Sequence, residues 1–363
     1  MMSVKTSKFL DCNMRISKIL KDDFDFLARE YNFSSLFHSS FFVTGSTGLI
    51  GKQIVLFLLY LNETFNAGIS IYALARTKEK VLRVFGENAK CNSLTFIYGD
   101  LSTFEIPDEK IDYIIHGASI TSSKDFVCKP VETIRTAVDG TLKMLEVAYE
   151  KKVRSFVYLS SMEVFGVTDN KLKSVKENDY GYIDIMNPRS SYSESKRLCE
   201  CLCSSWFSEY GLPVKIARLT QVLGPGIDYN DTRVAAQFAR SVIESKNIVL
   251  KTEGKTKRPV LYTRDAVSGV FTILIKGDNG QTYTVANPET FMTIKETAEL
   301  IIKEIANNRI KLVFDIDIPK EYAPNLNLNL NVDKLESLGW LPSVDLKNSY
   351  SRMISELKSR ACV

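Results

Sequence analysis

The stretch of sequence that decides the fold spans residues 41–51 and reads Phe41-Phe42-Val43-Thr44-Gly45-Ser46-Thr47-Gly48-Leu49-Ile50-Gly51. Its first four residues favour a buried strand, and the apolar spacing of residues 51–61 favours a helix. The glycines between them permit a tight turn, a close approach of backbone amides to an anion, and close packing of the helix on the strand. The stretch therefore predicts a strand, a glycine-rich turn and a helix whose N-terminus faces the pyrophosphate of a dinucleotide.

The rest of the chain alternates apolar, strand-like runs with helical patterns. The expected strands are 41–44, 69–75, 94–98, 113–116, 155–159 and 214–219, and the helices between them include 51–61, 131–150 and 193–210. This alternation indicates a parallel, doubly wound sheet. Beyond residue 226 the pattern loosens into a helix at 233–245, strands near 248–252 and 282–285, and helices near 293–306 and 346–357.

We therefore expect an α/β fold in which a Rossmann-like doubly wound parallel sheet carries a smaller, mixed α/β substrate lobe towards the C-terminus. The predicted division is a helical leader at 1–40, a dinucleotide-binding domain at 41–222 to which residues 258–275 return, and a lobe at 223–257 and 276–363. Apolar residues recur at helical spacing between 16 and 31, so we expect the leader to dock on the main domain.

The composition is that of an ordinary globular protein, with 45% hydrophobic and 25% charged residues among 363. The 47 basic and 43 acidic residues are spread without long runs of one sign, which argues against a nucleic-acid binder. No apolar run approaches the ~18 to 20 residues that span a bilayer, and the N-terminus lacks a signal-peptide core. Cys199, Cys201 and Cys203 alternate along a predicted helix, so we expect reduced thiols, no metal site and a cytoplasmic protein.

The end of the second expected strand bears on the cofactor. It reads Ala75-Arg76, where a dinucleotide fold usually places an acid on the ribose 2′-hydroxyl. A guanidinium can instead pair with a 2′-phosphate. We therefore expect NAD or NADP, with NADP slightly favoured, while stacking on the adenine or exposure to solvent are the alternatives for Arg76. His116, a single histidine beside small residues at a strand end, is interpreted as structural.

A serine, a tyrosine and a lysine suggest the chemistry. Ser161 follows the fifth expected strand, and Tyr192 and Lys196, four residues apart on a predicted helix, share one face. Lowering the pKa of a phenol from about 10 by roughly three units requires about 4 kcal/mol of preferential stabilisation of the phenolate. The Lys196 ammonium and a positively charged nicotinamide would supply it. Ser161 would hold the substrate oxygen while Tyr192 takes or returns its proton.

Together these residues resemble the extended short-chain dehydrogenase/reductases of the NAD-dependent epimerase/dehydratase family, from about residue 41 to residue 351. The resemblance implies an adenine-contacting turn at 98–101 and a segment beneath the cofactor at 116–119. It also implies a homodimer that forms through the helices at 131–150 and 193–210. The implied cofactor-binding residues are Gly45, Thr47, Gly48, Leu49, Ile50, Gly51, Arg76, Asp100, Leu101, Ala118, Ser119, Tyr192 and Lys196.

Further segments resemble the members of this family that act on nucleotide-linked sugars. Residues 218–226 resemble the R-x-x-N-x-x-G-P turn, with Gln221 in place of the asparagine, and Arg258 lies in a segment that resembles G-x-x-x-R-x-x-x-x-x-x-D. The resemblance implies a nucleoside-diphosphate sugar as partner. Its substrate-binding residues would be Ser161, Glu163, Gln221, Arg233 and Arg258, with the two arginines at the diphosphate. Exposed surface arginines without a ligand are the alternative for both.

The residues after Ser161 bear on the reaction. Met162 stands where sugar 4,6-dehydratases carry an acidic aspartate, and it cannot donate a proton. Residues 161–166 and 188–197 resemble the S/T-S-E-V-Y-G and P-R-x-x-Y-x-E-x-K-R segments of UDP-glucuronate decarboxylases. If the strand continues, Glu163 leaves it on the same side as Ser161, enters the pocket and assists the step after oxidation. A carboxylate that is tied to backbone amides is the alternative.

The expected function is transient oxidation of the sugar at carbon 4 with bound NAD(P), followed by decarboxylation or epimerisation. An NADPH-dependent reductase of a nucleotide-linked keto sugar and a sugar-nucleotide 4,6-dehydratase are the enzymatic alternatives. A dinucleotide-binding regulator without catalysis is a third, and the intact catalytic set of Ser161, Tyr192 and Lys196 counts against it.

Overall fold

The computed structural model describes residues 14–317 and 325–361. At its centre lies a sheet of seven parallel strands in the order β11-β6-β5-β4-β1-β2-β3. This is the order of a doubly wound dinucleotide-binding sheet, extended by one edge strand, so the predicted fold class is confirmed. The strands are β1 (Ser40–Thr44), β2 (Ser70–Ala75), β3 (Leu94–Tyr98), β4 (Tyr113–His116), β5 (Ser155–Ser161), β6 (Val214–Leu219) and β11 (Thr282–Val285).

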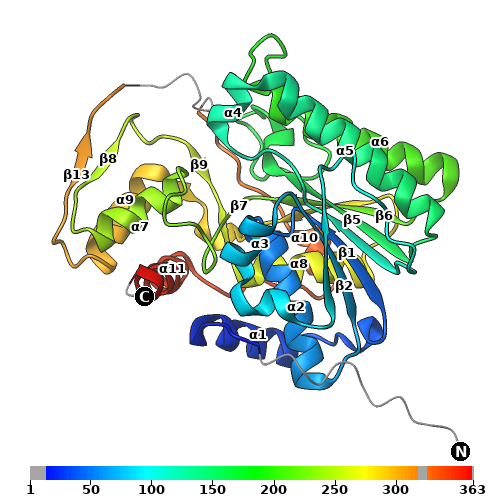
Figure 1. Ribbon diagram of the computed structural model, residues 1–363. Helices are drawn as coiled ribbons and strands as arrows, with labels where there is room; N and C mark the ends of the chain where they lie inside the picture. The colour runs from blue at the N-terminus through cyan, green and yellow to red at the C-terminus, as the bar shows by residue number, and fades with distance from the viewer. Residues whose placement is uncertain (1–13, 318–324, 362–363) are drawn as a thin grey trace, which may run out of the picture.

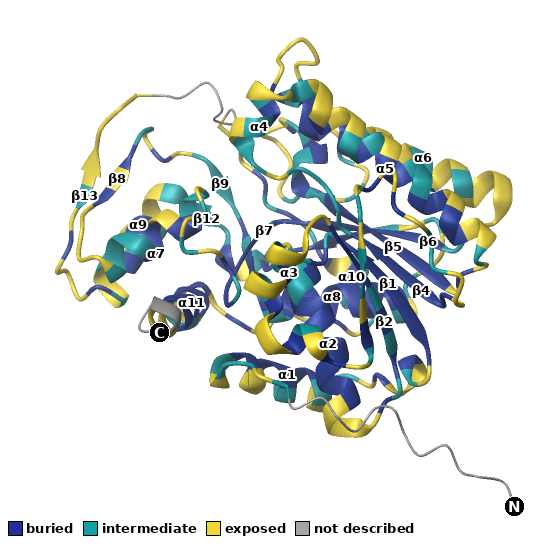
Figure 2. Cartoon of the chain, viewed as in Figure 1, coloured by how far each residue is buried: buried dark blue, intermediate teal, exposed yellow. Residues whose placement is uncertain are grey.

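Helices cover both faces of this sheet (Figure 1). α5 and α6 pack together on one face, while α2 and α8 pack on the other. All five residues of β1 are buried, with Phe42 in the apolar cluster under α5 and α6 and Phe41 and Val43 in the cluster under α2 and α8. Figure 2 shows the sheet mostly buried and the outer sides of the helices exposed. The helices are α2 (Leu49–Phe65), α3 (Lys78–Phe85), α4 (Ser123–Cys128), α5 (Pro130–Glu150), α6 (Ser190–Tyr210) and α8 (Thr263–Lys276).

Shorter elements form a second lobe beside the sheet (Figure 1). Three helices share an apolar cluster there with β8, which pairs in parallel with β13. Next to them β7 pairs in parallel with β10, and β9 pairs antiparallel with β12. These elements are β7 (Gln221–Leu223), α7 (Val234–Ile243), β8 (Ile248–Leu250), β9 (Lys257–Arg258), β10 (Val260–Tyr262), β12 (Met292–Thr293), α9 (Ile294–Glu304), β13 (Leu312–Phe314) and α11 (Leu346–Ala361). The short helix α10 (Asp333–Glu336) lies instead against β11 of the central sheet.

One strand lies outside the lobe in which the sequence places it. The expected lobe includes residues 276–363, but β11 is the edge strand of the central sheet. Thr282 pairs with Ile216, and Val285 pairs with Leu219. The expectation is wrong here because the apolar pattern of four residues indicates where a strand lies in the sequence but not which strand it pairs with.

The leader forms α1 (Lys18–Glu30), which packs against α2 and α8 as expected. Its buried carboxylate, Asp23, accepts hydrogen bonds from Tyr262 at 2.7 Å and from Arg352 at 2.8 Å. Burial raises the pKa of Asp23 to about 6, against the opposing charge of Arg352. This carboxylate ties the leader both to β10 and to α11. Residues 1–13 of the expected leader lie outside the described residues.

The expectation of reduced thiols is confirmed at Cys199, Cys201 and Cys203, and Cys128 is also a free thiol. Cys91, which lies away from that helix, is disulfide-bonded. Cys12 and Cys362 lie outside the described residues. Within residues 14–317 and 325–361, no group of three potential metal ligands is placed to hold a metal, and no helix could cross a membrane.

Candidate active site

The glycine-rich turn joins β1 to the N-terminus of α2, as the sequence predicts. Gly45 has a φ of 68°, and a Cβ on it would lie 2.6 Å from the carbonyl carbon of Gly117. A Cβ on Gly51 would lie 2.3 Å from the Gly45 oxygen. Gly48 begins the helix without a side-chain hydrogen bond at the cap, so a phosphate there would accept bonds from backbone amides at the positive end of the helix dipole. Three predicted residues are partly exposed at this turn, namely Thr47, Leu49 and Ile50.

A group of cations lies where β2 gives way to α3. Arg76 is exposed directly after the strand, and Lys80 and Arg83 lie on the helix. Burial lowers the pKa of Lys80, and the charges of Arg76 and Arg83 lower it further, so the three cations are close together. None of the ion pairs found between described side chains involves these three residues. The group is therefore a ready partner for an anion.

The predicted residues after β3 differ in their surroundings. Asp100 is exposed and accepts hydrogen bonds from the amide and the hydroxyl of Ser102. Leu101 is buried against Gly140 of α5, where a Cβ would lie 2.0 Å from its side chain. Asp100 can therefore face a ligand, whereas the Leu101 side chain packs the core.

The end of β4 is held by a buried polar network. Thr44 Oγ1 accepts hydrogen bonds from the amides of residues 117 and 118, each at 3.2 Å, and lies 2.7 Å from Nδ1 of His116. Burial, and then a nearby lysine ammonium, lowers the pKa of His116 to about 3, so the ring is neutral. The network fixes the position of Ala118 and Ser119, which are partly exposed.

The structure brings Ser161, Tyr192 and Lys196 together at the end of β5. The side chains of Ser161 and Tyr192 lie next to each other, and the Tyr192 ring stacks on Phe126 of α4 with ring centres 4.3 Å apart. Nζ of Lys196 donates to the Leu159 carbonyl at 2.8 Å and lies 5.9 Å from the centre of the Tyr192 ring. The serine, the phenol and the ammonium thus occupy one buried corner, where a hydroxyl of a substrate could be held and deprotonated.

Burial dominates the titration of this corner. It raises the pKa of Tyr192 to about 12, and the Glu163 carboxylate raises it further, against the opposing effect of the hydrogen bond from Ser161. Burial also lowers the pKa of Lys196 to about 8. In the protein alone the phenol is therefore protonated at neutral pH. It needs a further positive charge beside it before it can act as a base.

Glu163 does not lie on a continued strand. Residues Met162–Phe165 form the 3₁₀-helix η3, in which the Glu163 amide donates to Ser161 Oγ at 3.2 Å. The expectation of an extended segment is therefore wrong, because the serine hydroxyl caps a helical turn instead. The Glu163 carboxylate is not tied to backbone amides either. It accepts two hydrogen bonds from Arg189, at 2.9 and 3.0 Å, and one from Ser193 at 3.0 Å.

The Glu163 carboxylate nevertheless faces the site. Its charge raises the pKa of Tyr192 and also that of Arg258, against the lowering that burial causes at Arg258. It therefore lies near both the phenol on α6 and the arginine on β9. Arg189, its partner, is 9% exposed and was not among the predicted site residues, although it belongs to the P-R-x-x-Y segment.

The predicted substrate arginines have different surroundings. Nη1 of Arg258 is buried without a hydrogen-bond partner, and Arg258 borders a hollow of about 20 Å³ together with Gln221 and Tyr350. Arg233 is 36% exposed and pairs with Asp231, both of whose carboxylate oxygens lie 3.0 Å from its Nε. An unpaired buried guanidinium is costly, so Arg258 is a strong candidate for contact with an anionic ligand.

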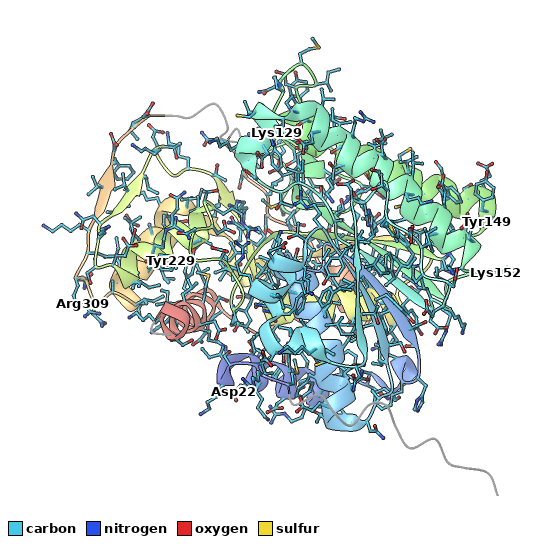
Figure 3. All side chains as sticks on the ribbon, in the orientation of Figure 1. Asp22, Lys129, Tyr149, Lys152, Tyr229 and Arg309 are labelled. Carbon is cyan, nitrogen blue, oxygen red and sulfur yellow. The ribbon has the colours of Figure 1, made fainter. Side chains whose placement is uncertain are left out.

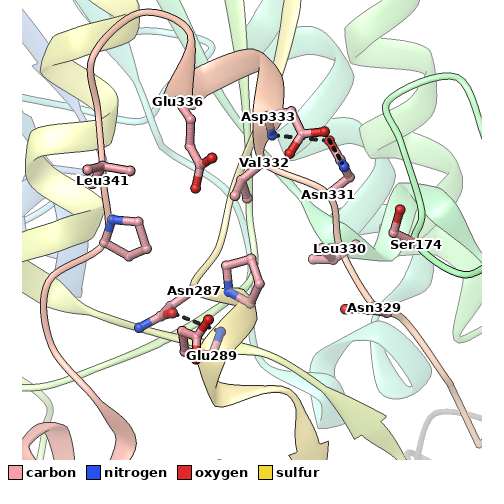
Figure 4. A pocket seen from close by; sticks show the side chains of 12 residues that line it. Ser174, Asn287, Glu289, Asn329, Leu330, Asn331, Val332, Asp333, Glu336 and Leu341 are labelled. Carbon is pink, nitrogen blue, oxygen red and sulfur yellow. Dashed lines mark hydrogen bonds between the residues drawn. The ribbon is translucent and has the colours of Figure 1, made fainter.

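A larger hollow of about 480 Å³ lies beyond the edge strand β11 (Figure 4). None of the predicted site residues lines it. Figure 4 shows Glu336 pointing into it on one side, with Asn287 and Glu289 opposite. Asn287 and Asp333 already make hydrogen bonds, to the Glu289 amide and to Asn331. The hollow is thus separate from the corner that holds Tyr192.

Comparison with known proteins identifies the family. The sequence model of the "NAD dependent epimerase/dehydratase family" matches residues 41–287. The chain belongs to this family. UDP-glucuronic acid decarboxylase 3 of Arabidopsis thaliana is 31% identical over 322 residues, which are 88% of this chain and 89% of that protein. UDP-glucuronic acid decarboxylase 1 of the same plant is 31% identical over 69% of this chain and 56% of its own length.

The fold is also that of solved structures. UDP-N-acetylglucosamine 4-epimerase of Methanobrevibacter ruminantium superposes with a TM-score of 0.75 at 20% identity, covering 89% of this chain and 99% of the other. The matched family residues begin at β1 and include the glycine turn and the corner with Ser161, Tyr192 and Lys196. The family is described by its dependence on NAD, which supports a nicotinamide cofactor for this chain.

Two site residues were missed by the sequence reasoning. Phe126 stacks on the Tyr192 ring and lies on a helix of six residues, too short to give a helical pattern. Arg189 holds Glu163 through two hydrogen bonds, and the distance of 26 residues between them gives no sequence signal. Its place three residues before Tyr192 in the P-R-x-x-Y segment was the available hint.

Proposed function

We propose that this chain binds a nicotinamide cofactor and a nucleoside-diphosphate sugar, oxidises the sugar transiently at carbon 4, and then decarboxylates or epimerises it. The grouping of Ser161, Tyr192 and Lys196 beside the glycine turn is the observation that carries the proposal. The similarity to UDP-glucuronic acid decarboxylases over 88% of the chain favours decarboxylation of UDP-glucuronate over epimerisation.

The roles of the side chains follow from their positions. Ser161 would hold the oxygen on the reacting carbon, and Tyr192 would accept its proton during oxidation and return it later. A bound nicotinamide cofactor supplies hydride transfer, and its oxidised ring carries the additional positive charge that the phenol requires. Lys196, whose ammonium lies near the Tyr192 ring, would stabilise the phenolate. Phe126 fixes the plane of the phenol by stacking on it.

Residues on the lobe side would hold the rest of the substrate. The unpaired Nη1 of Arg258 would donate a hydrogen bond to an oxygen of the diphosphate or to a carboxylate of the sugar. Arg233 would need to share its guanidinium between Asp231 and the substrate. The Glu163 carboxylate, held by Arg189, would contact the sugar and assist the step that follows oxidation.

The cation group of Arg76, Lys80 and Arg83 supports NADP as the preferred cofactor. It lies after β2, where the adenosine ribose of a dinucleotide is bound in this fold, and none of its members forms an ion pair with a described acidic side chain. Three cations without an anion favour a ligand with an additional phosphate. This observation also favours the second candidate function, an NADPH-dependent reductase of a nucleotide-linked keto sugar that releases its cofactor after each turnover.

One experiment distinguishes the two candidates. The purified enzyme is incubated with UDP-glucuronate and either NAD or NADP, with a panel of other sugar nucleotides in parallel, while product mass and cofactor absorbance are followed. A product lighter by carbon dioxide, or an isomer of the substrate, without net reduction of the cofactor supports the first candidate. Stoichiometric consumption of NADPH with a keto-sugar nucleotide supports the reductase. No conversion of any nucleotide sugar would refute both.

A further inference from the structure

Helix α6 lies against three successive residues at the end of β5. Two of them form hydrogen bonds with helix residues and the third, Ser161, lies beside Tyr192, and these helix residues are spaced by one turn along a single face. The strand carbonyl accepts from the lysine at 2.8 Å, and the middle serine donates to the glutamate at 2.5 Å. The pairs are Leu159 with Lys196, Ser160 with Glu200, and Ser161 with Tyr192.

The third member of this face, Glu200, is buried against an arginine from the neighbouring strand. Arg218 of β6 has no exposed surface, and its Nε lies 3.0 and 3.1 Å from the two Glu200 oxygens while its Nη2 lies 2.6 Å from one of them. The same guanidinium donates to the Glu177 carbonyl and to the Tyr180 hydroxyl. The ion pair of Glu200 and Arg218 thus connects β5, β6, α6 and the segment 177–180, which precedes α6.

We propose that Glu200 is a positioning residue for Lys196, and that together with Arg218 it holds the catalytic helix in register with Ser161. The inference rests on the proposed function, because it assigns Lys196 the task of stabilising a phenolate. Glu200 pairs directly with Arg218, while Lys196, one turn away on the same helix, donates to the Leu159 carbonyl and is affected by the Glu200 charge. Without Glu200 both cations would lie in the core with no opposite charge, an arrangement that proteins rarely tolerate.

Four other titratable groups that face Lys196 are neutral at neutral pH. Burial lowers the pKa of His116 on β4 to about 3 and raises that of Tyr158 on β5 well above 10. On α6, burial raises the pKa of Cys203 and that of Tyr192. Cys199, also on α6, donates a hydrogen bond to the Ala137 carbonyl at 3.3 Å.

Glu200 is therefore the anion that favours the charged form of Lys196 among the described groups around it. Burial lowers the pKa of Lys196 to about 8, and the Glu200 charge opposes that decrease. Above this pH the ammonium loses its proton, so catalysis that depends on it should decline. The alkaline limb of the pH profile reports the charge of Lys196 and hence the influence of Glu200.

The test is the pH profile of kcat for Glu200→Gln, which keeps the size of the side chain and one accepting oxygen but removes its charge. We expect the alkaline limb to move to lower pH by roughly one unit or more, because an opposite charge has been removed from the neighbourhood of a buried ammonium. Activity at lower pH, where Lys196 remains charged, should fall much less. The matched control is Glu194→Gln on the same helix, where the carboxylate pairs with Arg197 at 3.5 Å. This variant should not change the pH of the alkaline limb.

For a second variant we expect the alkaline limb to shift in the opposite direction. This variant serves as the test if Glu200→Gln does not fold. Arg218→Gln removes the competing cation, so Glu200 acts on Lys196 alone and the alkaline limb should move to higher pH. A purely structural role would lower kcat at every pH and leave the limb of both variants where it is in the wild type, which would overturn the inference. If Tyr192→Phe retained full activity, the proposed function itself would fail, so the two failures are distinguishable.

Discussion

Lys196→Met removes a buried ammonium while keeping an unbranched side chain of similar length. The ammonium is 2% exposed, and burial lowers its pKa from the usual 10.5 to about 8. A lowered pKa means that the folded protein disfavours the charged form relative to the unfolded chain. We therefore expect the variant to be inactive but more stable than the wild type at neutral pH.

The magnitude follows from the shift. A difference of about 2.5 pKa units corresponds to about 3 kcal/mol of unfolding free energy at 1.36 kcal/mol per unit. The variant also loses the hydrogen bond from Nζ to the Leu159 carbonyl, which contributes about 1 kcal/mol. The expected net gain is about 2 kcal/mol at pH 7. It is fully present below about pH 8 and disappears as the pH rises towards 10.5, where the lysine is neutral in both states.

Urea unfolding of both proteins at several pH values between 7 and 10 measures this difference. The gap in unfolding free energy should narrow steadily as the pH rises. A variant less stable than the wild type at pH 7, with a gap that does not change with pH, would show that Lys196 is not a strained buried cation.

Three further predictions concern the cofactor, the acid and the assembly. Arg76→Ala should weaken the binding of NADP by about 1.5 to 3 kcal/mol, the scale of a charge-assisted hydrogen bond, and barely alter the binding of NAD. Equal losses of binding free energy for both cofactors in calorimetric titrations would show that Arg76 only stacks or packs. Glu163→Gln should still oxidise the bound sugar, seen as reduced-cofactor absorbance, while final product falls sharply; unchanged product formation would leave Glu163 a structural role. The protein should be a homodimer through α5 and α6, whose outer faces expose Tyr149 (Figure 3), Leu198 and Tyr210 by 50%, 47% and 48%. Light scattering should give twice the chain mass at micromolar concentration, and a monomeric mass would refute the assembly.

Much of the fold could be predicted because its strands and helices carry strong local patterns. Strands β3, β4 and β6 begin and end where the apolar runs do, and the glycine spacing at Gly45, Gly48 and Gly51 marks the turn. Tyr192 and Lys196 could be paired from sequence, since a spacing of four residues on a helix fixes their shared face. These features depend on neighbours in the chain, which is why the sequence reveals them.

Features that depend on distant partners could not be predicted. The pairing of β11 with β6 and the ion pair between Glu163 and Arg189 join segments 26 or more residues apart, and no spacing rule connects them. The turn at Met162–Phe165 was expected to be extended because the capping by the Ser161 hydroxyl leaves no periodic signal. The structure supplies these contacts.

The turnover of Tyr192→Phe tests the central claim most directly. The substitution removes one hydroxyl and keeps the ring that stacks on Phe126, so the fold and cofactor binding should remain nearly intact. If Tyr192 transfers the proton of the sugar hydroxyl, turnover of the nucleotide sugar should fall by at least ~100-fold, the usual scale for removing a general acid or base. Near-full turnover in a folded variant that still binds the cofactor would contradict the account.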